Sequence, residues 1–175
     1  MSIAQLLQEH IRNIPDFPKP GILFKDITPI LSAPEVFHKT IGALHSRYAA
    51  HKIDAVIGIE SRGFIFGAPL ALQLGCKFVP VRKRGKLPYD TVEYSYDLEY
   101  GTATIEIHTD ALQAGEKVLI VDDLLATGGT AEAACRLVEK LGGKVHECAF
   151  VVELNFLQGR EKLQPIPTHS LVQFD

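Results

Sequence analysis

V-L-I-V-D-D-L-L-A-T-G-G-T, which spans Val118 to Thr130, is the stretch of sequence that decides the fold. Its first four residues are apolar, as in a short strand buried on both faces of a parallel sheet. Two carboxylates, Asp122 and Asp123, follow this run, and a Gly-Thr loop comes after them. Apolar residues at helical spacing from Ala134 to Leu141 then predict an amphipathic helix, which Gly142 would end. The stretch therefore predicts a strand, an acidic edge, a loop and a helix in succession.

The loop before this helix has the features of a phosphate-binding loop. A helix N-terminus exposes unpaired N–H groups and a partial positive charge, and glycines let the backbone approach a ligand closely. Carboxylates repel phosphate but accept hydrogen bonds from sugar hydroxyls. We therefore predict a bound sugar phosphate, with its hydroxyls on Asp122 and Asp123 and its phosphate on the loop. The loop residues are Ala126, Thr127, Gly128, Gly129 and Thr130. An ordinary turn, whose glycines only shape the chain, is the alternative.

Length and composition indicate one globular domain. The 175 residues are enough for a substantial core, and 46% of them are hydrophobic. A net charge of −3 does not provide the basic surface that nucleic-acid binding usually needs. Cys76, Cys135 and Cys148 form no Cys-x-x-Cys motif and are typical of buried thiols in a reducing compartment. With no secretory signal and no apolar run of ~20 residues, we expect a cytoplasmic protein that does not bind membranes.

Two further predicted strands end in polar, Gly-containing segments that carry cations. Ala55 to Ile59 is followed by E-S-R-G-F, and Lys77 to Val81 is followed by R-K-R-G-K. Because parallel strands bring their carboxyl ends to one edge of a sheet, we expect Arg62 and this cationic run to lie near Asp122. Arginine suits a second phosphate group through its bidentate geometry. The alternatives are a salt bridge from Arg62 to Glu60 and an ordinary solvated charge run.

The remaining segments suggest a lid and a stacking surface. Residues 87–100 are rich in Tyr, Asp and Glu and contain little aliphatic material, which favours a mobile lid or a two-stranded flap. The strand from Thr104 to His108 would belong to this flap or to a sheet edge. Phe24 lies next to Lys25 and could stack on a planar ring, although a phenylalanine in an apolar trio is more often part of the core.

The quoted motif closely resembles the binding motif for 5-phosphoribosyl 1-diphosphate (PRPP) in type I phosphoribosyltransferases. The segments G-I-L-F-K-D, E-S-R-G-F-I-F-G, V-R-K-R-G-K-L-P and Y-D-L-E-Y-G are similar to those of family members that use adenine. The resemblance implies an α/β fold with a central, mostly parallel twisted sheet flanked by helices, and a non-proline cis peptide in the E-S-R-G loop. It implies a single domain, 1–175, with an N-terminal helix and base-binding hood (1–30), a flexible lid or flap (83–104) and a PRPP motif with its helix (118–141).

Roles for individual residues are also implied by the resemblance. The implied PRPP- and AMP-binding residues are Arg62, Arg82, Lys83, Lys86, Tyr100, Asp122, Asp123, Ala126, Thr127, Gly128, Gly129 and Thr130. Glu99 and Arg62 would be the catalytic residues, with Glu99 acting as an acid–base group near the purine. The implied adenine-binding residues are Leu23, Phe24, Lys25 and Leu154. Phe24 and Leu154 would cover opposite faces of the ring, and Lys25 stands where many members have Arg.

The implied reaction is the transfer of a 5-phosphoribosyl group from PRPP to adenine, which gives AMP and diphosphate in purine salvage. It would pass through an oxocarbenium-like state as the diphosphate leaves. The cofactor would be Mg²⁺, held mainly by PRPP oxygens with no direct protein ligand, because Mg²⁺ prefers oxygen ligands and retains waters. The family also implies a homodimer.

Two other functions remain open from the sequence. The first is a phosphoribosyltransferase for 6-oxopurines or for a pyrimidine. Several 6-oxopurine enzymes place a lysine in the strand after the central motif, and here that strand reads F-V-V-E-L-N. The second is a regulator that binds PRPP or AMP without chemistry. Such regulators usually add a DNA-binding segment, for which this chain has neither the length nor the charge.

Overall fold

The computed structural model describes residues 1–97 and 101–175. The strands are β1 (Arg12–Pro15), β2 (Leu23–Asp26), β3 (Ala55–Ile59), β4 (Lys77–Lys83), β5 (Thr91–Asp97), β6 (Thr102–His108), β7 (Lys117–Leu125), β8 (Lys144–Leu154) and β9 (Thr168–Phe174). The helices are α1 (Ile3–His10), α2 (Thr28–Ser32), α3 (Pro34–Tyr48), α4 (Arg62–Leu74), α5 (Gly129–Lys140) and α6 (Gly159–Leu163), with a 3₁₀ turn, η1 (Asn155–Leu157).

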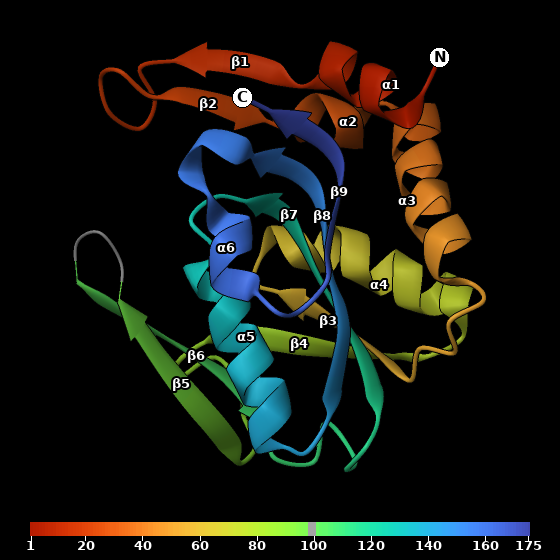
Figure 1. The fold of residues 1–175 in the computed structure, drawn as a ribbon, viewed down its shortest axis with the longest axis vertical. Helices are drawn as coiled ribbons and strands as arrows, with labels where there is room; N and C mark the ends of the chain where they lie inside the picture. The colour runs from red at the N-terminus through yellow and green to blue at the C-terminus, as the bar shows by residue number, and fades with distance from the viewer. Residues whose placement is uncertain (98–100) are drawn as a thin grey trace.

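A seven-stranded sheet in the order β5-β6-β4-β3-β7-β8-β9 forms the centre of the molecule (Figure 1). Strands β4, β3, β7, β8 and β9 run parallel, whereas β6 is antiparallel to β4 and β5 is antiparallel to β6. Helices α3 and α4 lie on one side of the sheet and α5 lies on the other (Figure 1). The predicted α/β fold with a mostly parallel sheet is therefore confirmed.

Alternating side chains of the central strands supply two separate cores. In β7, Leu119 and Val121 belong to the core under α3 and α4, whereas Val118 and Ile120 belong to the core under α5. All four are fully buried. A strand that is covered on both faces has no solvent-facing side to keep polar, which explains why this run is continuously apolar.

The N-terminal segment packs on the end of the large sheet rather than extending away from it. Helix α1 begins at a capping box between Ser2 and Gln5, and its Leu6 and Leu7 are buried in the core that includes α3. Strands β1 and β2 then form an antiparallel hairpin, which lies near the C-terminus (Figure 1). The apolar face of α1 is therefore used within the chain.

The flap is better anchored than its composition suggests. Strands β5 and β6 pair over their whole described length. The other edge of β6 pairs with β4 at Arg82 and Lys83. The edge strand is thus β5, while β6 has a neighbour on both sides. Val92, Tyr94 and Tyr96 pack against the core under α5, so aromatic side chains replace the aliphatic anchors that the sequence lacks.

In the part of the chain that the structure describes, no helix combines the length and the apolar character needed to cross a membrane.

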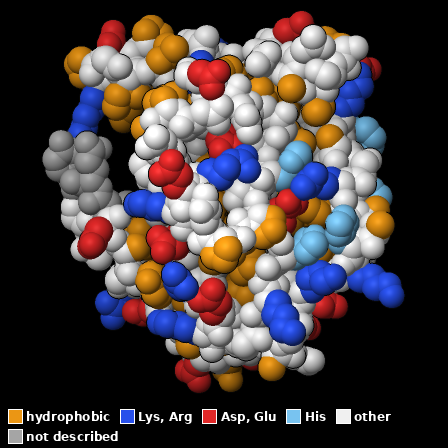
Figure 2. All heavy atoms as spheres, in the orientation of Figure 1, with side chains coloured by type: hydrophobic (Ala, Val, Ile, Leu, Met, Phe, Trp, Pro, Cys, Tyr) orange, Lys and Arg blue, Asp and Glu red, His pale blue; other side chains and the backbone are white. Residues whose placement is uncertain are grey.

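A buried ionic cluster links α3 to the N-terminal end of β8. Arg47 donates two hydrogen bonds of 2.8 Å to the Glu147 carboxylate, and the Tyr48 hydroxyl donates a third of 2.6 Å. The ring of His146 lies 4.8 Å from that of His51. Histidine side chains gather beside charged side chains on the face shown in Figure 2. Burial, together with neighbouring positive charges, lowers the pKa of His146.

We expect the free energy of unfolding to fall as the pH is lowered from about 7 to about 5. Burial and the nearby Arg47 lower the pKa of His169 as well, so the unfolded chain binds protons at both histidines before the folded chain does. The double variant His146→Gln, His169→Asn should therefore depend less steeply on pH in this window. Urea unfolding at a series of pH values measures this slope, and an unchanged slope would contradict the assignment.

Candidate active site

A pocket of about 380 Å³ lies at the carboxyl ends of the parallel strands. Its lining residues are Ile59, Glu60, Ser61, Arg62, Lys83, Asp122, Asp123, Leu124, Ala126 and Thr130. They follow or end three adjacent strands, β4, β3 and β7. The structure thus brings Arg62 and Lys83 to the same edge as the two carboxylates, as the strand pattern predicts.

Arg62 joins the end of β3 to the end of β7. Its Nε donates a 2.5 Å hydrogen bond to Oδ2 of Asp123. The Asp123 side chain is 6% exposed, while that of Arg62 is 49% exposed and faces the pocket. The alternative bridge from Arg62 to Glu60 does not form. Glu60 instead accepts hydrogen bonds from the side chain of Arg82, at 3.1 Å, and from the backbone N–H of Lys83.

The surroundings of Asp122 disfavour the ionised form of its carboxyl group. Burial, followed by the adjacent charge of Asp123, raises the pKa of Asp122 well above its usual range. Its Oδ1 accepts a 2.8 Å hydrogen bond from the backbone N–H of Asp123. Because both carboxylates line the pocket, donors such as ribose hydroxyls can reach them and favour the ionised form.

The loop between β3 and α4 approaches β7 closely. The Glu60–Ser61 peptide bond is cis, as the resemblance implies. Gly63 follows in the first turn of α4, and a Cβ atom added there would lie 2.7 Å from the carbonyl oxygen of Val121 and 3.1 Å from Oδ1 of Asp122. Glycine at this position therefore allows the segment that carries Arg62 to touch the acidic end of β7.

Residues Ala126 to Thr130, here called the phosphate-binding loop, lead into α5. They line a small cavity of about 80 Å³ with Asp122, Leu124, Ala131 and Phe150. Gly128 is the residue before the helix and has φ of 83°, a conformation that L side chains rarely adopt. The N–H groups of the first helical turn therefore open towards the same end of β7 as the carboxylates.

A flap residue that the sequence did not single out contacts this loop. The hydroxyl groups of Tyr96 and Thr130 share a hydrogen bond of 2.9 Å. Tyr96 and Thr130 also line a second pocket, of about 470 Å³, which shares Ile59, Glu60 and Lys83 with the first. The alternating tyrosines of β5, Tyr94 and Tyr96, indicate that one face of the flap is partly buried, but no local pattern identifies Thr130 as the partner of Tyr96.

Not every cation of the R-K-R-G-K run faces the pocket. Lys83 lines it, whereas Arg82 is held by Glu60 and donates to the carbonyl oxygen of Lys86 at 3.3 Å. The backbone N–H of Lys86 donates to Glu106, a buried carboxylate. Burial alone would raise the pKa of Glu106, but backbone N–H groups around the turn lower it. Sequence reasoning missed Glu106, because it resembles any polar residue of an alternating strand.

The base-binding candidates lie in β2 and at the end of β8. Phe24 packs edge-on against Phe17, with 5.2 Å between ring centroids, and it belongs to neither core. Lys25 donates to Asn13 and lies 4.2 Å over the ring of Phe174. Phe174 is the register partner of Leu154. The hairpin therefore meets the sheet next to Leu154.

Leu23, the remaining base-binding candidate, is half exposed in the same strand. Glu99 and Tyr100 lie outside the described residues.

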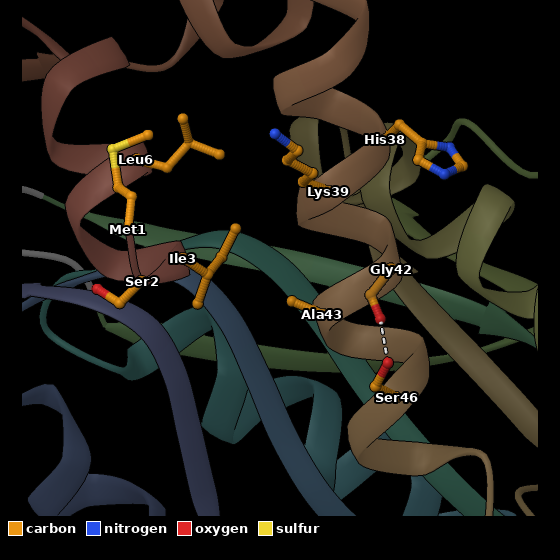
Figure 3. Close-up of a pocket in the computed structure, with 9 residues that line it drawn as sticks. All are labelled: Met1, Ser2, Ile3, Leu6, His38, Lys39, Gly42, Ala43 and Ser46. Atoms are coloured by element: carbon orange, nitrogen blue, oxygen red, sulfur yellow. Dashed lines mark hydrogen bonds between the residues drawn. The ribbon is translucent and has the colours of Figure 1, made fainter.

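A third hollow, of about 590 Å³, has different chemistry. It lies between α1 and α3, where Met1, Ile3 and Leu6 face Gly42 and Ala43 (Figure 3). It contains none of the predicted site residues. The pocket at the carboxyl edge of the sheet is therefore the candidate active site.

Comparison with known proteins agrees with this geometry. The model of the phosphoribosyl transferase domain matches residues 27–168. The chain belongs to the type I phosphoribosyltransferase family. The adenine phosphoribosyltransferase of Chloroflexus aurantiacus is 59% identical over 97% of this chain and 98% of its own length.

Solved structures of phosphoribosyltransferases resemble the whole chain. The adenine phosphoribosyltransferase of Thermoanaerobacter pseudethanolicus superposes with a TM-score of 0.94 at 53% identity, covering 98% of this chain and 99% of its own. The enzyme of Saccharomyces cerevisiae, solved with an imino-altritol bisphosphate and adenine, has a TM-score of 0.92 at 48% identity, covering 97% of this chain and 98% of its own. This phosphoribosyltransferase is therefore a pentosyltransferase, and it shares the fold of these solved structures over 97–98% of the given chain.

Substitution of Gly63 by alanine should destabilise the phosphoribosyltransferase by ~1–3 kcal/mol, because the new Cβ has no space beside β7. The same change at Gly42, where an added Cβ meets nothing within 4 Å, is the matched control. In helix α3 it should stabilise the protein by about 0.5–1 kcal/mol. Chemical denaturation measures both values. Equal stability of the two variants would contradict the close contact between the loop and β7.

Proposed function

We propose that this protein transfers the 5-phosphoribosyl group of PRPP to adenine, giving AMP and diphosphate, as a step of purine salvage. The observation that carries the proposal is the candidate active site itself. It joins two carboxylates, the two ends of the phosphate-binding loop, Ala126 and Thr130, and the cations Arg62 and Lys83 in one pocket. The names of its relatives, adenine phosphoribosyltransferases at 59% and 56% identity, support the choice of base.

The pocket suits each part of PRPP in turn. Asp122 and Asp123 accept hydrogen bonds from the ribose hydroxyls. The phosphate-binding loop takes the 5-phosphate through its N–H and hydroxyl groups. Arg62 and Lys83 neutralise the diphosphate, with Arg82 and Lys86 contributing from the adjoining turn. Holding the ribose at three points aligns its reacting carbon with the base.

The reaction breaks the bond from the anomeric carbon to diphosphate and forms a bond to the purine nitrogen. Positive charge develops on the ribose as the diphosphate leaves, and the nearby carboxylates stabilise it. Glu99 takes the proton that the purine loses, directly or through water. Tyr100 and the flap exclude water that would otherwise hydrolyse PRPP.

The base site is assigned to the hairpin and to the end of β8. Phe24 stacks on one face of adenine, Leu154 covers the other, and Leu23 and Lys25 supply backbone contacts. Lys25 supports this arrangement because its side chain is already held by Asn13 and Phe174. Its ammonium group is therefore directed to the protein, and a lysine in place of arginine leaves the backbone reading of the base intact.

Mg²⁺ is the proposed cofactor, and its charge helps to neutralise the diphosphate when it is bound. Two of the carboxylate oxygens are already engaged, since Asp123 accepts from Arg62 and Asp122 accepts from a backbone N–H. The pocket therefore fits an ion held mainly by PRPP oxygens and waters, with the carboxylates at most in its outer shell.

We also propose a cytoplasmic location and a homodimer. All three cysteines are free, including Cys135 and Cys148, whose sulfur atoms lie 3.6 Å apart in the core. Reduced thiols of this kind are usual in the cytoplasm. Ile65 and Leu72 are exposed seven residues apart on α4, which places them on one helical face. A second copy of the chain is the proposed occupant of that face.

Incubation with PRPP, Mg²⁺ and each nucleobase in turn tests the activity. We expect AMP from adenine and no nucleotide when Mg²⁺ is withheld. Asp123→Asn should lower kcat/KM for PRPP ~100-fold, because it removes the negative charge and one of the two accepting oxygens that Arg62 and the ribose share. Glu147→Gln, which alters a similarly buried carboxylate paired with Arg47, is the control. Product from hypoxanthine alone would contradict the choice of base, and PRPP binding without any product would support a regulator.

Light scattering after size-exclusion chromatography tests the dimer. The wild-type protein should have twice the mass of the chain, and Leu72→Glu should shift it towards the monomer, because it places a charge at the more exposed of the two apolar residues on this face. Leu72 is 83% exposed, so this substitution leaves the core unaltered. Gln73→Glu adds the same charge at the next exposed position and should leave the mass unchanged. A monomeric wild-type protein would contradict the proposal.

A further inference from the structure

The turn that begins α6 is in direct backbone contact with the phosphate-binding loop. A Cβ atom added at Gly159 would overlap the carbonyl oxygen of Ala126 and lie 3.0 Å from the amide nitrogen of Gly128. A Cβ atom added at Gly128 would in turn overlap the carbonyl oxygen of Gly159. No side chain can fit between the two segments. The position of the loop therefore depends on the position of Gly159.

Arg160 attaches this turn to the large sheet. Its guanidinium donates to both oxygens of Glu153, with Nε–Oε1 and Nη2–Oε2 distances of 3.0 and 2.5 Å. Its Nη1 also donates to the carbonyl oxygen of Thr168, at 2.5 Å. Glu153 is the register partner of Leu125, the last residue of β7 before the loop. The guanidinium group of Arg160 thus links the turn to the paired strands β7 and β8, next to the residue that precedes the loop.

Further contacts hold the turn in place. The Glu153 carboxylate also accepts hydrogen bonds from Ser170 and from Gln173. Burial alone would raise the pKa of Glu153, but the hydrogen bonds of Arg160 and Ser170 lower it, so the carboxylate stays ionised. Leu163, at the other end of α6, is buried in the same core as Leu125. The turn is therefore fixed at both ends.

The flap also contacts the loop, through the hydrogen bond that the hydroxyl groups of Tyr96 and Thr130 share. Gly128, the residue before α5, has no side chain that could cap the helix. A site that binds an anion through backbone N–H groups must hold them within about 0.5 Å of the right positions. Neighbouring packing has to supply that precision.

We propose that Gly159 and Arg160 are positioning residues for the phosphate-binding loop. The backbone of Gly159 packs against Ala126 and Gly128, and Arg160 fixes the position of Gly159 through its ion pair with Glu153. Neither residue touches the ligand; they act on the 5-phosphate through the loop. The proposal rests on the proposed function only in assigning that phosphate to the loop.

The test compares Arg160→Lys with Arg47→Lys. Both arginines make bidentate pairs with a buried glutamate of β8, and the side-chain exposures match, at 41% and 5% for Arg160–Glu153 and 42% and 8% for Arg47–Glu147. Lysine keeps the charge and loses the fork. Calorimetry with ribose 5-phosphate and with inorganic diphosphate then measures the two anion sites separately.

Arg160→Lys should weaken ribose 5-phosphate binding ~10-fold and leave diphosphate binding within about twofold. The KM for PRPP should rise while the KM for adenine is unchanged. Arg47→Lys should leave all of these values as in the wild type, even where its loss of thermal stability is equal. Equal effects of the two variants on ribose 5-phosphate, or an equal loss of diphosphate binding in Arg160→Lys, would overturn the proposal.

Gly159→Ala provides a second variant that keeps the Arg160 hydrogen bonds. It should show the same selective loss of ribose 5-phosphate binding. Gly143→Ala is its control, because an added Cβ there would lie 2.9 Å from Val138, beyond the C-terminal end of α5, whereas the loop precedes its N-terminal end. Ribose 5-phosphate binding needs no base. A protein that bound it normally but made no AMP would therefore contradict the proposed function and leave this proposal standing.

Discussion

The parallel pairing of β3 with β7 is the constraint on which the candidate active site depends. Gly58 lies opposite Val121, so the residues that follow each strand emerge at the same edge of the sheet. The segment after β3 supplies the cation Arg62 and the end of β7 supplies the carboxylate Asp123, and a 2.5 Å hydrogen bond joins them. Two chain segments about sixty residues apart are thereby held in one geometry by backbone pairing and a single ion pair.

Ion pairs neutralise part of the charge at this edge of the sheet. Arg62 compensates Asp123, and Arg82 compensates Glu60, so two of the cations support the site by fixing carboxylates. Asp122 lacks the direct arginine bond that Asp123 has, and its pKa is raised by burial and by its neighbour. A ligand with hydroxyl donors relieves that unfavourable environment, whereas a second anion would worsen it. The same electrostatics therefore favour a sugar over a phosphate beside Asp122.

Local patterns predicted much of the fold. The apolar run before Asp122, the Gly-Thr loop and the helical spacing after it each depend on residues close in the chain, and a strand and a helix form there as expected. The predicted end of the strand was wrong, because β7 continues through Asp122 and Asp123 to Leu125. The composition of the flap was misleading, because Tyr94 and Tyr96 anchor it although it has few aliphatic residues. Phe24 was equally ambiguous, since a short apolar trio reads the same in a core strand and in a hairpin outside both cores.

The sequence by itself determined the order of elements and the chemistry at the strand ends, because periodicity and the Asp-Asp, Gly-Gly and Arg-Lys clusters are short-range properties. Tertiary structure alone decided which charged groups meet. Arg62 pairs with Asp123 and not with Glu60, although Glu60 is nearer in the sequence. Arg160 pairs with Glu153, next to the contact between Gly159 and the phosphate-binding loop. The physical reason is that these contacts depend on how strands and turns distant in sequence are packed together, and no local pattern records that packing.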